Sequence, residues 1–188
     1  PLSWKDTLDP KWKGKIGMQS IENGGSAFGA QAFLRITLGD GAWPMLALNE
    51  PRLYSSVSTV LTDLVRGRIG VAYLDASSVA TQIAAGAPLK MVFPSEGVVG
   101  FGVFGHVTSS APRPNAGRLW INYVTSKRGS TAMTASGAYG THPDAPPPAA
   151  ARYTFPSADK VWTIAPEQWD KVSESWTEEW KKIVAIKK

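Results

Sequence analysis

Apolar residues in the first hundred positions fall into two patterns that alternate along the chain. Apolar runs at 16–18 and 69–74, and a third at 89–93 that is interrupted by Lys90, predict strands, and the last run ends at Pro94. Between these runs, apolar residues recur three or four positions apart, which is the spacing of an amphipathic helix. Strands that alternate with helices predict an α/β fold with a mostly parallel sheet flanked by helices.

Small polar residues and glycines mark the boundaries of the expected helices. The first helix follows the Gly-rich turn 23–26, where Ser26 can cap free backbone amides, and the second ends at Gly67. A third, shorter helix runs from Asp75 to Gly86. The inward-facing residues of the first two helices are Ala27, Ala30, Leu34 and Leu38, then Val57, Leu61, Leu64 and Val65.

The second half of the chain has a less regular pattern. Residues 98–107 form a strand-like run interrupted by glycines, and a helix from Pro114 is expected to turn Leu119 and Tyr123 inward. The Pro- and Ala-rich residues 138–160 predict a long surface connection. The last helix carries an apolar stripe that predicts packing against a core: Trp169, Val172, Trp176, Trp180 and Ile183.

Composition excludes several classes of protein. The chain has 188 residues, 43% of them hydrophobic, enough for a core in one domain or two small lobes. The net charge of +5 comes with lysines clustered near both ends, whereas a nucleic-acid binder gathers basic residues along one face. The absence of cysteine excludes thiol catalysis, disulfides and zinc–thiolate sites. No apolar run is long enough to span a membrane, and no signal peptide is visible.

Catalytic chemistry finds little support in the sequence. His106 and His142 each lack a carboxylate at ligand-like spacing, and isolated histidines are more often surface or loop residues. The Gly-x-Ser-x-Gly pattern of a hydrolase is absent, and residues 24–26 are not followed by the Gly-Lys-Ser/Thr of a phosphate-binding loop. The sequence therefore predicts a protein that is not an enzyme, with no cofactor and no metal.

Binding is better supported, because three strand-to-helix junctions carry small polar residues. These junctions are 24–28, 54–58 and 75–78. In a parallel sheet such junctions share the edge where ligands bind, and helix amino termini suit carboxylate or phosphate groups. Ordinary helix capping explains each junction separately, but three junctions at one edge favour a binding site.

Four stretches also carry a family resemblance: residues 4–16, 54–67, 86–97 and 111–129. In this order they resemble segments of the extracellular solute-binding proteins of ABC importers. The most similar cluster contains the ferric-iron-binding proteins and their organic-ligand relatives. The third stretch, for example, has Gly-Ala-Pro at 86–88 and Pro-Ser-Glu-Gly at 94–97.

The resemblance implies a type II periplasmic-binding-protein fold, in which two α/β lobes enclose a cleft. Residues 1–97 would be the second lobe with a crossover segment. Residues 98–188 would return to the first lobe and end in helices packed on it. The opening part of that first lobe has no counterpart here, so the chain resembles the C-terminal part of these proteins.

The resemblance also implies a ligand site on the three junctions. Ser77 and Ser78 stand where the iron binders carry adjacent tyrosines, so a ferric site is not expected. Asp75 stands where a neutral amide is common, which favours a ligand with an amino or hydroxyl group. The expected ligand-binding residues are Gly25, Ser26, Ala27, Ser55, Ser56, Asp75, Ser77 and Ser78.

The function implied is that of a receptor for an ABC importer. It would capture a small polar, anionic organic solute in the interlobe cleft and present it to the importer's membrane subunits. Its location would be periplasmic, or extracellular with a membrane tether. Two alternatives remain open, namely a ferric-iron or metal-complex binder and the ligand-sensing module of a regulator.

Overall fold

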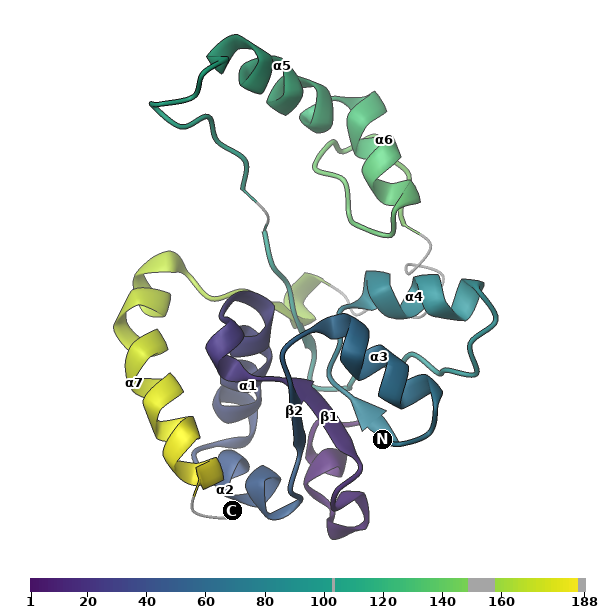
Figure 1. The fold of residues 1–188 in the computed structure, drawn as a ribbon, viewed down its shortest axis with the longest axis vertical. Coiled ribbons are helices and arrows are strands. Elements are labelled where there is room, and N and C mark those ends of the chain that lie inside the picture. The colour runs from purple at the N-terminus through teal and green to yellow at the C-terminus, as the bar shows by residue number, and fades with distance from the viewer. Residues whose placement is uncertain (103, 149–157, 186–188) are drawn as a thin grey trace.

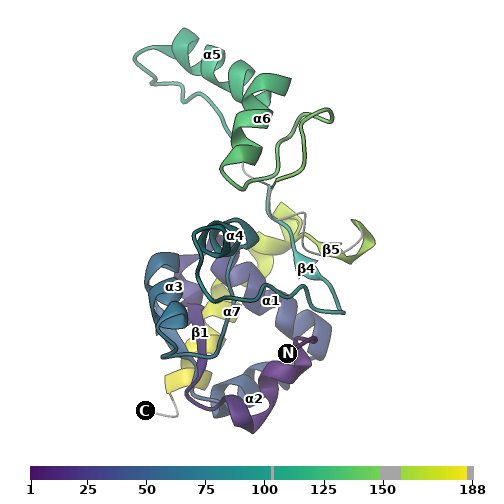
Figure 2. The same ribbon diagram turned by 90° about the vertical axis from the view of Figure 1, so that its right-hand side faces the viewer.

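The structure, a computed structural model, describes residues 1–102, 104–148 and 158–185. They form two parts that we call the body and the arm. The body comprises residues 1–102 and 158–185, and the arm comprises residues 104–148. Two helices of the arm stand apart from the body in both perpendicular views (Figures 1 and 2).

The helices and strands follow the chain from the body to the arm and back. The first pass through the body contains η1 (Lys5–Leu8), η2 (Pro10–Trp12), β1 (Ile16–Gln19), η3 (Ile21–Asn23), α1 (Gly25–Leu38), α2 (Ala42–Leu48), β2 (Arg52–Tyr54), α3 (Val57–Val65), β3 (Val71–Ala72), α4 (Ala76–Ala84) and β4 (Val98–Val99). The arm contains α5 (Pro114–Thr125) and α6 (Lys127–Ala135), and the return to the body contains η5 (Ala158–Lys160), β5 (Val161–Trp162) and α7 (Pro166–Ala185).

A parallel sheet of order β2-β1-β3 lies at the centre of the body. Gly17 of β1 stands opposite Arg52 of β2 and Ala72 of β3, so all three strands end at the same edge. The middle strand is tightly covered, because a Cβ at Gly17 would lie 2.3 Å from Cδ1 of Ile69. The predicted α/β fold with a parallel sheet is confirmed.

Three predicted strands differ from those in the structure. The run 69–74 pairs only within β3, and the run 98–107 pairs only within β4, because the chain then leaves the body toward the arm. No strand covers residues 89–93. The amide of Leu89 donates to the carbonyl of Ala87 at 2.8 Å, so this segment begins in a tight turn instead of pairing with a neighbouring strand.

A hydrophobic core fills the space between the sheet and helices α1, α2 and α7. Its large members include two tryptophans, and Trp180 of α7 is only 1% exposed. The Trp180 ring lies edge-on to Trp43 of α2, with centroids 5.5 Å apart. The buried cluster consists of Leu8, Ile16, Met18, Ile21, Phe28, Ala32, Leu34, Ala42, Trp43, Leu46 and Trp180.

Helix α7 confirms the predicted apolar stripe of the last helix. Its apolar stripe is amphipathic as expected, and Trp169 and Trp176 lie with ring centroids 4.6 and 6.4 Å from that of Phe28. Helix α7 lies against α1 and α2, both within residues 1–97 (Figure 1), and the assignment of the last helices to a first lobe stays a prediction. Phe28 and Trp43 supply the apolar surface that the α7 stripe covers.

Arg35 of α1 links helices α1, α2 and α7, because its guanidinium forms ion pairs and stacks on aromatic rings. Its guanidinium carbon lies 4.8 Å from the ring centroid of Trp43 and 4.7 Å from that of Trp176. The guanidinium also pairs with Glu179 of α7 at 2.6 Å and with Asp40 at 2.8 Å. An arginine is suited to this position, because its flat guanidinium can stack and bind carboxylates at once.

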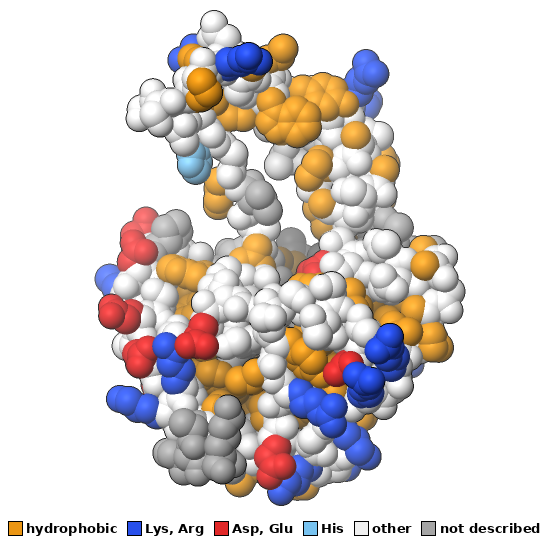
Figure 3. All heavy atoms as spheres, in the orientation of Figure 1, with side chains coloured by type: hydrophobic (Ala, Val, Ile, Leu, Met, Phe, Trp, Pro, Cys, Tyr) orange, Lys and Arg blue, Asp and Glu red, His pale blue; other side chains and the backbone are white. Residues whose placement is uncertain are grey.

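The arm exposes much of its apolar surface. Leu119 is 71% exposed and Tyr123 is 40% exposed, so the prediction that they face inward is wrong. Helix α5 has no buried residue, since the described chain supplies nothing that covers this face. Apolar side chains gather on the arm in Figure 3. Its exposed large apolar residues are Phe104, Leu119, Trp120, Tyr123, Met133 and Tyr139.

The surface connection predicted for 138–160 lies partly outside the described residues, which omit 149–157. Residues 138–148 contain turns and bends without a helix or strand, in agreement with that prediction.

Candidate functional site

The three polar junctions lie at the carboxyl edge of the sheet. The first follows β1 and leads into α1, the second joins β2 to α3, and the third joins β3 to α4. Neighbouring strands are about 4.8 Å apart, so the outer two junctions begin roughly 10 Å from each other. Parallel α/β sheets bind ligands at this edge.

Helix α1 begins without a side-chain cap, so the prediction that Ser26 caps it is wrong: the helix starts at Gly25, which places Ser26 inside its first turn. Gly24 and Gly25 have φ angles of 63° and 48°, which glycine adopts without strain. The amides of Ala27 and Phe28 bond to the Gly24 carbonyl. Within the described residues the amides of Gly25 and Ser26 have no acceptor, so two donors remain at the positive end of the helix dipole.

Asn23 ties the first junction to the second. Its side-chain amide donates to the carbonyl of Ser55 at 3.0 Å and to that of Tyr54 at 3.4 Å. The amide of Ser20 donates to the same Tyr54 carbonyl at 2.9 Å. These bonds hold the end of β2 beside the start of α1.

At the second junction the serines act mainly as structural groups. Ser56 caps α3, since its hydroxyl accepts from the amide of Thr59 at 3.3 Å. The same hydroxyl lies 3.0 Å from that of Ser58 and 2.8 Å from that of Thr59. Ser55 is exposed, and its carbonyl accepts the Asn23 bond.

At the third junction Asp75 caps α4. Its Oδ1 accepts from the hydroxyl of Ser77 at 2.6 Å and from the amide of Ser78 at 2.8 Å. Burial alone would raise the pKa of Asp75, but these hydrogen bonds outweigh it and hold the pKa below its ordinary value. The third junction therefore carries a fixed negative charge, unlike the first.

Gly137 and Phe101, which lie outside the three junctions, contact the helices that follow the third and the first junction. A Cβ at Gly137 of the arm would lie 3.0 Å from Cβ of Ser77, so the arm reaches the start of α4 here. A Cβ at Gly29 of α1 would lie 2.1 Å from Cζ of Phe101, so this ring lies directly on α1. Both contacts depend on glycine, because any side chain would displace the neighbour.

The eight predicted residues thus lie at one edge of the sheet, with different surroundings. Hydrogen bonds of Asn23 connect the first two junctions. The third junction lies at the same edge because β3 is the other neighbour of β1 in the sheet. The role of these residues in ligand binding stays a prediction. Sequence reasoning placed Asn23 in the glycine turn without giving it a role, and Phe101 and Gly137 were missed because their contacts are distant in sequence.

The groups available for metal binding are few. Tyr73 follows β3, but its hydroxyl lies 2.7 Å from that of Thr7, and burial raises its pKa. Nδ1 of His142 accepts a bond from the amide of Asp144. In the part of the chain that the structure describes, no three His, Asp or Glu side chains gather closely enough to hold a metal ion.

The body is a parallel α/β unit with three polar junctions at one edge of its sheet, and sequence comparison places this fold in a known class. Residues 1–162 match the family of bacterial extracellular solute-binding proteins, so the chain belongs to this family. Among residues 1–102, 104–148 and 158–185, no helix is both long and apolar enough to cross a bilayer.

Solved structures share the fold. The substrate-binding protein of an ABC transporter from Agrobacterium tumefaciens aligns with a TM-score of 0.77 and 19% identity, covering 98% of this chain and 60% of that one. The periplasmic binding protein AfuA from Actinobacillus pleuropneumoniae, with fructose 6-phosphate bound, aligns with a TM-score of 0.74 and 24% identity. This alignment covers 96% of this chain and 60% of that one. A periplasmic thiamin binding protein aligns with 0.76 and 17% identity, covering 98% and 59%.

The chain therefore spans about 60% of the length of these solved structures. An uncharacterized protein of Haemophilus influenzae is 29% identical over 136 residues, which are 69% of this chain and 38% of that protein.

Proposed function

We propose that this protein is part of the solute receptor of an ABC importer and that it performs no bond chemistry. The observation that carries the proposal is the unsatisfied amino terminus of α1 at the carboxyl edge of a parallel sheet, in a member of the solute-binding family. Its partners would be a small-molecule solute and the importer's membrane subunits. Its place would be the periplasm, or the outer surface with a membrane tether.

The ligand proposed is a small polar organic anion. The amides of Gly25 and Ser26 would hold its anionic group, because they are free donors at the positive end of α1. Asp75 would accept a hydrogen bond from a hydroxyl or amino group elsewhere on the solute, since its carboxylate stays ionised. AfuA, which has a similar fold, was solved with fructose 6-phosphate bound, and this solute is anionic and carries hydroxyl groups.

The lobe division is also part of the proposal. We place one lobe in residues 1–97, with α7 added because it packs on that unit. The arm, residues 104–148, would belong to the other lobe. Residues 98–102 are left out of it, because β4 pairs with β5 and Phe101 lies on α1 in the body. Closure of two lobes over a solute would change the surface presented to the importer.

The test is a titration of the protein with fructose 6-phosphate and with inorganic phosphate, followed by calorimetry. Ser26→Glu places a carboxylate beside the free amides and is expected to weaken binding of both probes at least about tenfold. Thr62→Glu, which adds the same charge on the exposed surface of α3, is the control and should change affinity less than about twofold. Equal losses in both variants would contradict an anion site at α1.

Two further measurements complete the test. Ser77→Ala should weaken solute binding by about 1 kcal/mol, the usual net contribution of one hydrogen bond, without unfolding the protein. Addition of ferric citrate should give no tyrosinate-to-iron absorption band, because Ser77 and Ser78 replace a tyrosine pair. Stoichiometric iron with such a band would favour the ferric alternative instead.

A further inference from the structure

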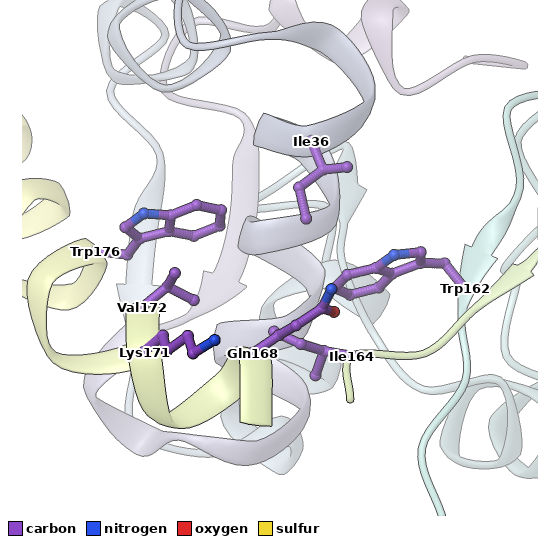
Figure 4. A pocket seen from close by; sticks show the side chains of 7 residues that line it. All are labelled: Ile36, Trp162, Ile164, Gln168, Lys171, Val172 and Trp176. Carbon is purple, nitrogen blue, oxygen red and sulfur yellow. The ribbon is translucent and has the colours of Figure 1, made fainter. Parts of the chain in front are cut away.

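A second candidate binding site lies on the body, away from the strand edge. It is a hollow of about 330 Å³ between the last turn of α1, β5 and the first half of α7 (Figure 4). Ser26 and Ile36 are ten residues apart on α1, so the hollow lies roughly 15 Å along the helix from the proposed solute site. Its lining residues are Ile36, Trp162, Ile164, Gln168, Lys171, Val172 and Trp176.

Most of the hollow's lining lies beyond the residues that match the family, with Ile36 and Trp162 inside them. The family match ends at residue 162, whereas most of the lining belongs to residues 164–176. Its volume falls at the lower end of the range for small-molecule pockets, about 300 to 1,000 Å³. The site therefore differs from the strand-edge site in place, in sequence and in composition.

The walls are apolar and aromatic. Two indoles, Trp162 and Trp176, stand on either side of the hollow in Figure 4, with Val172 and Ile164 between them. Ile36 is 50% exposed, so part of this wall is in contact with water. A ligand with an apolar body would remove these surfaces from water, at about 25 cal/mol per Å².

The hollow has two polar side chains, Lys171 and Gln168, and both can donate hydrogen bonds. Lys171 has no carboxylate partner among the described residues, although Glu167 and Glu174 lie one turn away on α7. The side-chain amide of Gln168 likewise has no hydrogen bond within the described chain, and Figure 4 shows both side chains at the same wall of the hollow. An unpaired ammonium beside an apolar wall is complementary to an organic anion.

From this combination we propose that the hollow binds a small amphipathic carboxylate, with its apolar body between Trp162 and Trp176 and its anionic group at Lys171. Such a ligand would connect α7 and β5 to the last turn of α1. Because the first turn of α1 holds the proposed solute site, the two sites share one rigid helix.

The experiment titrates the isotope-labelled protein with 4-phenylbutyrate and follows the indole N–H signals of Trp162 and Trp176 by NMR. 4-Phenylbutanol and 4-phenylbutylamine are the matched neutral and cationic probes. We expect both indole signals to shift with the carboxylate, and the other two probes to bind about threefold or more weakly. Unmoved indole signals at about 10 mM carboxylate, or equal binding of all three probes, would overturn the proposal.

Charge variants locate the anionic group. Lys171→Gln should weaken the carboxylate about threefold, the range of an exposed ion pair, and leave the alcohol unchanged. Lys182→Gln on the same helix is the control, because Lys182 is exposed and does not line the hollow. Equal effects of the two variants would contradict a specific role for Lys171.

A second pair of variants separates charge from a change in the apolar wall. Ile36→Glu and Ile36→Lys both replace a half-exposed apolar residue, so they alter the wall to a similar extent. Ile36→Lys should bind the carboxylate at least about tenfold more tightly than Ile36→Glu, and the order should reverse for the amine. If the two variants bind each probe equally, the hollow does not select by charge.

Discussion

The body and the arm are built from similar apolar residues but use them differently. Trp180 in the body is 1% exposed and lies in the core, whereas Trp120 in the arm is 63% exposed. The body covers its main apolar face with its own elements, including α7 from the far end of the chain. The arm has an amphipathic helix whose apolar face has no cover in the described chain. An apolar stripe in a sequence therefore predicts a helix face, but the rest of the fold decides what covers it.

The largest expected effect is in the body. Trp180→Ala removes a fully buried ring and leaves a cavity, so the free energy of unfolding should fall by about 3–5 kcal/mol. Urea unfolding followed by far-ultraviolet circular dichroism measures this loss. Trp180→Phe fills most of the space and should lose much less. A loss below about 1 kcal/mol for Trp180→Ala would show that α7 does not contribute to the core as described.

The next effect concerns how Arg35 connects the body helices. Arg35→Ala removes two ring-stacking contacts and two ion pairs, for a loss of about 2 kcal/mol in the free energy of unfolding. Arg35→Lys keeps the charge but not the flat guanidinium. It should recover less than half of the loss in the same urea experiment, and full recovery would show that charge alone matters.

A smaller effect is expected at the sheet edge, where Asp75 caps α4. Asp75→Ala should lower the free energy of unfolding by about 1 kcal/mol at neutral pH, the usual loss for a helix cap. The pKa of Asp75 is lowered on folding, so its stabilisation is present above the ordinary value of 3.8 and is lost as pH falls through the folded pKa.

The control for this prediction is Ser56→Ala, which removes the corresponding cap of α3 without removing a titratable group. The difference between wild type and Asp75→Ala should shrink below about pH 4, whereas that for Ser56→Ala should not. Unfolding curves at pH 7 and pH 3 make the comparison. Parallel pH dependence in both variants would count against the charged cap.

The smallest effect is expected in the arm. Trp120→Ala should change the free energy of unfolding by less than about 0.5 kcal/mol, because the ring is mostly in water already. The same urea experiment that measures Trp180→Ala gives this value. A loss comparable with that of Trp180→Ala would mean that the arm's apolar face is covered in solution, and the contrast between the two parts would fail.

Much of the fold was predictable because it depends on local pattern. The apolar runs and glycine stops gave the α/β order, the parallel sheet and the amphipathic α7. The strand predicted at 89–93 was wrong, since an apolar run specifies burial and not a pairing partner. The prediction that Leu119 and Tyr123 face inward was wrong for the same reason. Their spacing places them on one face of the helix but does not show what packs against that face.

The candidate site was predictable only as a location. Strand order brings the three junctions to one edge, and that follows from a parallel sheet. The free amides at α1 and the capped ends of α3 and α4 depend on individual hydrogen bonds, which the residue types alone do not decide. Asn23 illustrates the limit, because its position in the turn was visible but its bond to Ser55 was not.

The pairing of β4 with β5 constrains how the arm can move. The chain leaves the body at β4 and re-enters it at β5, and these strands run side by side, with Val98 opposite Val161. The amide of Gly100 adds a bond to the carbonyl of Trp162 at 2.8 Å. While this pair is intact, the body holds the exit and the return of the chain side by side, so neither strand can turn without the other. Cutting the backbone beside either strand would remove one of the two covalent attachments of the arm and leave its contact with the body at Ser77.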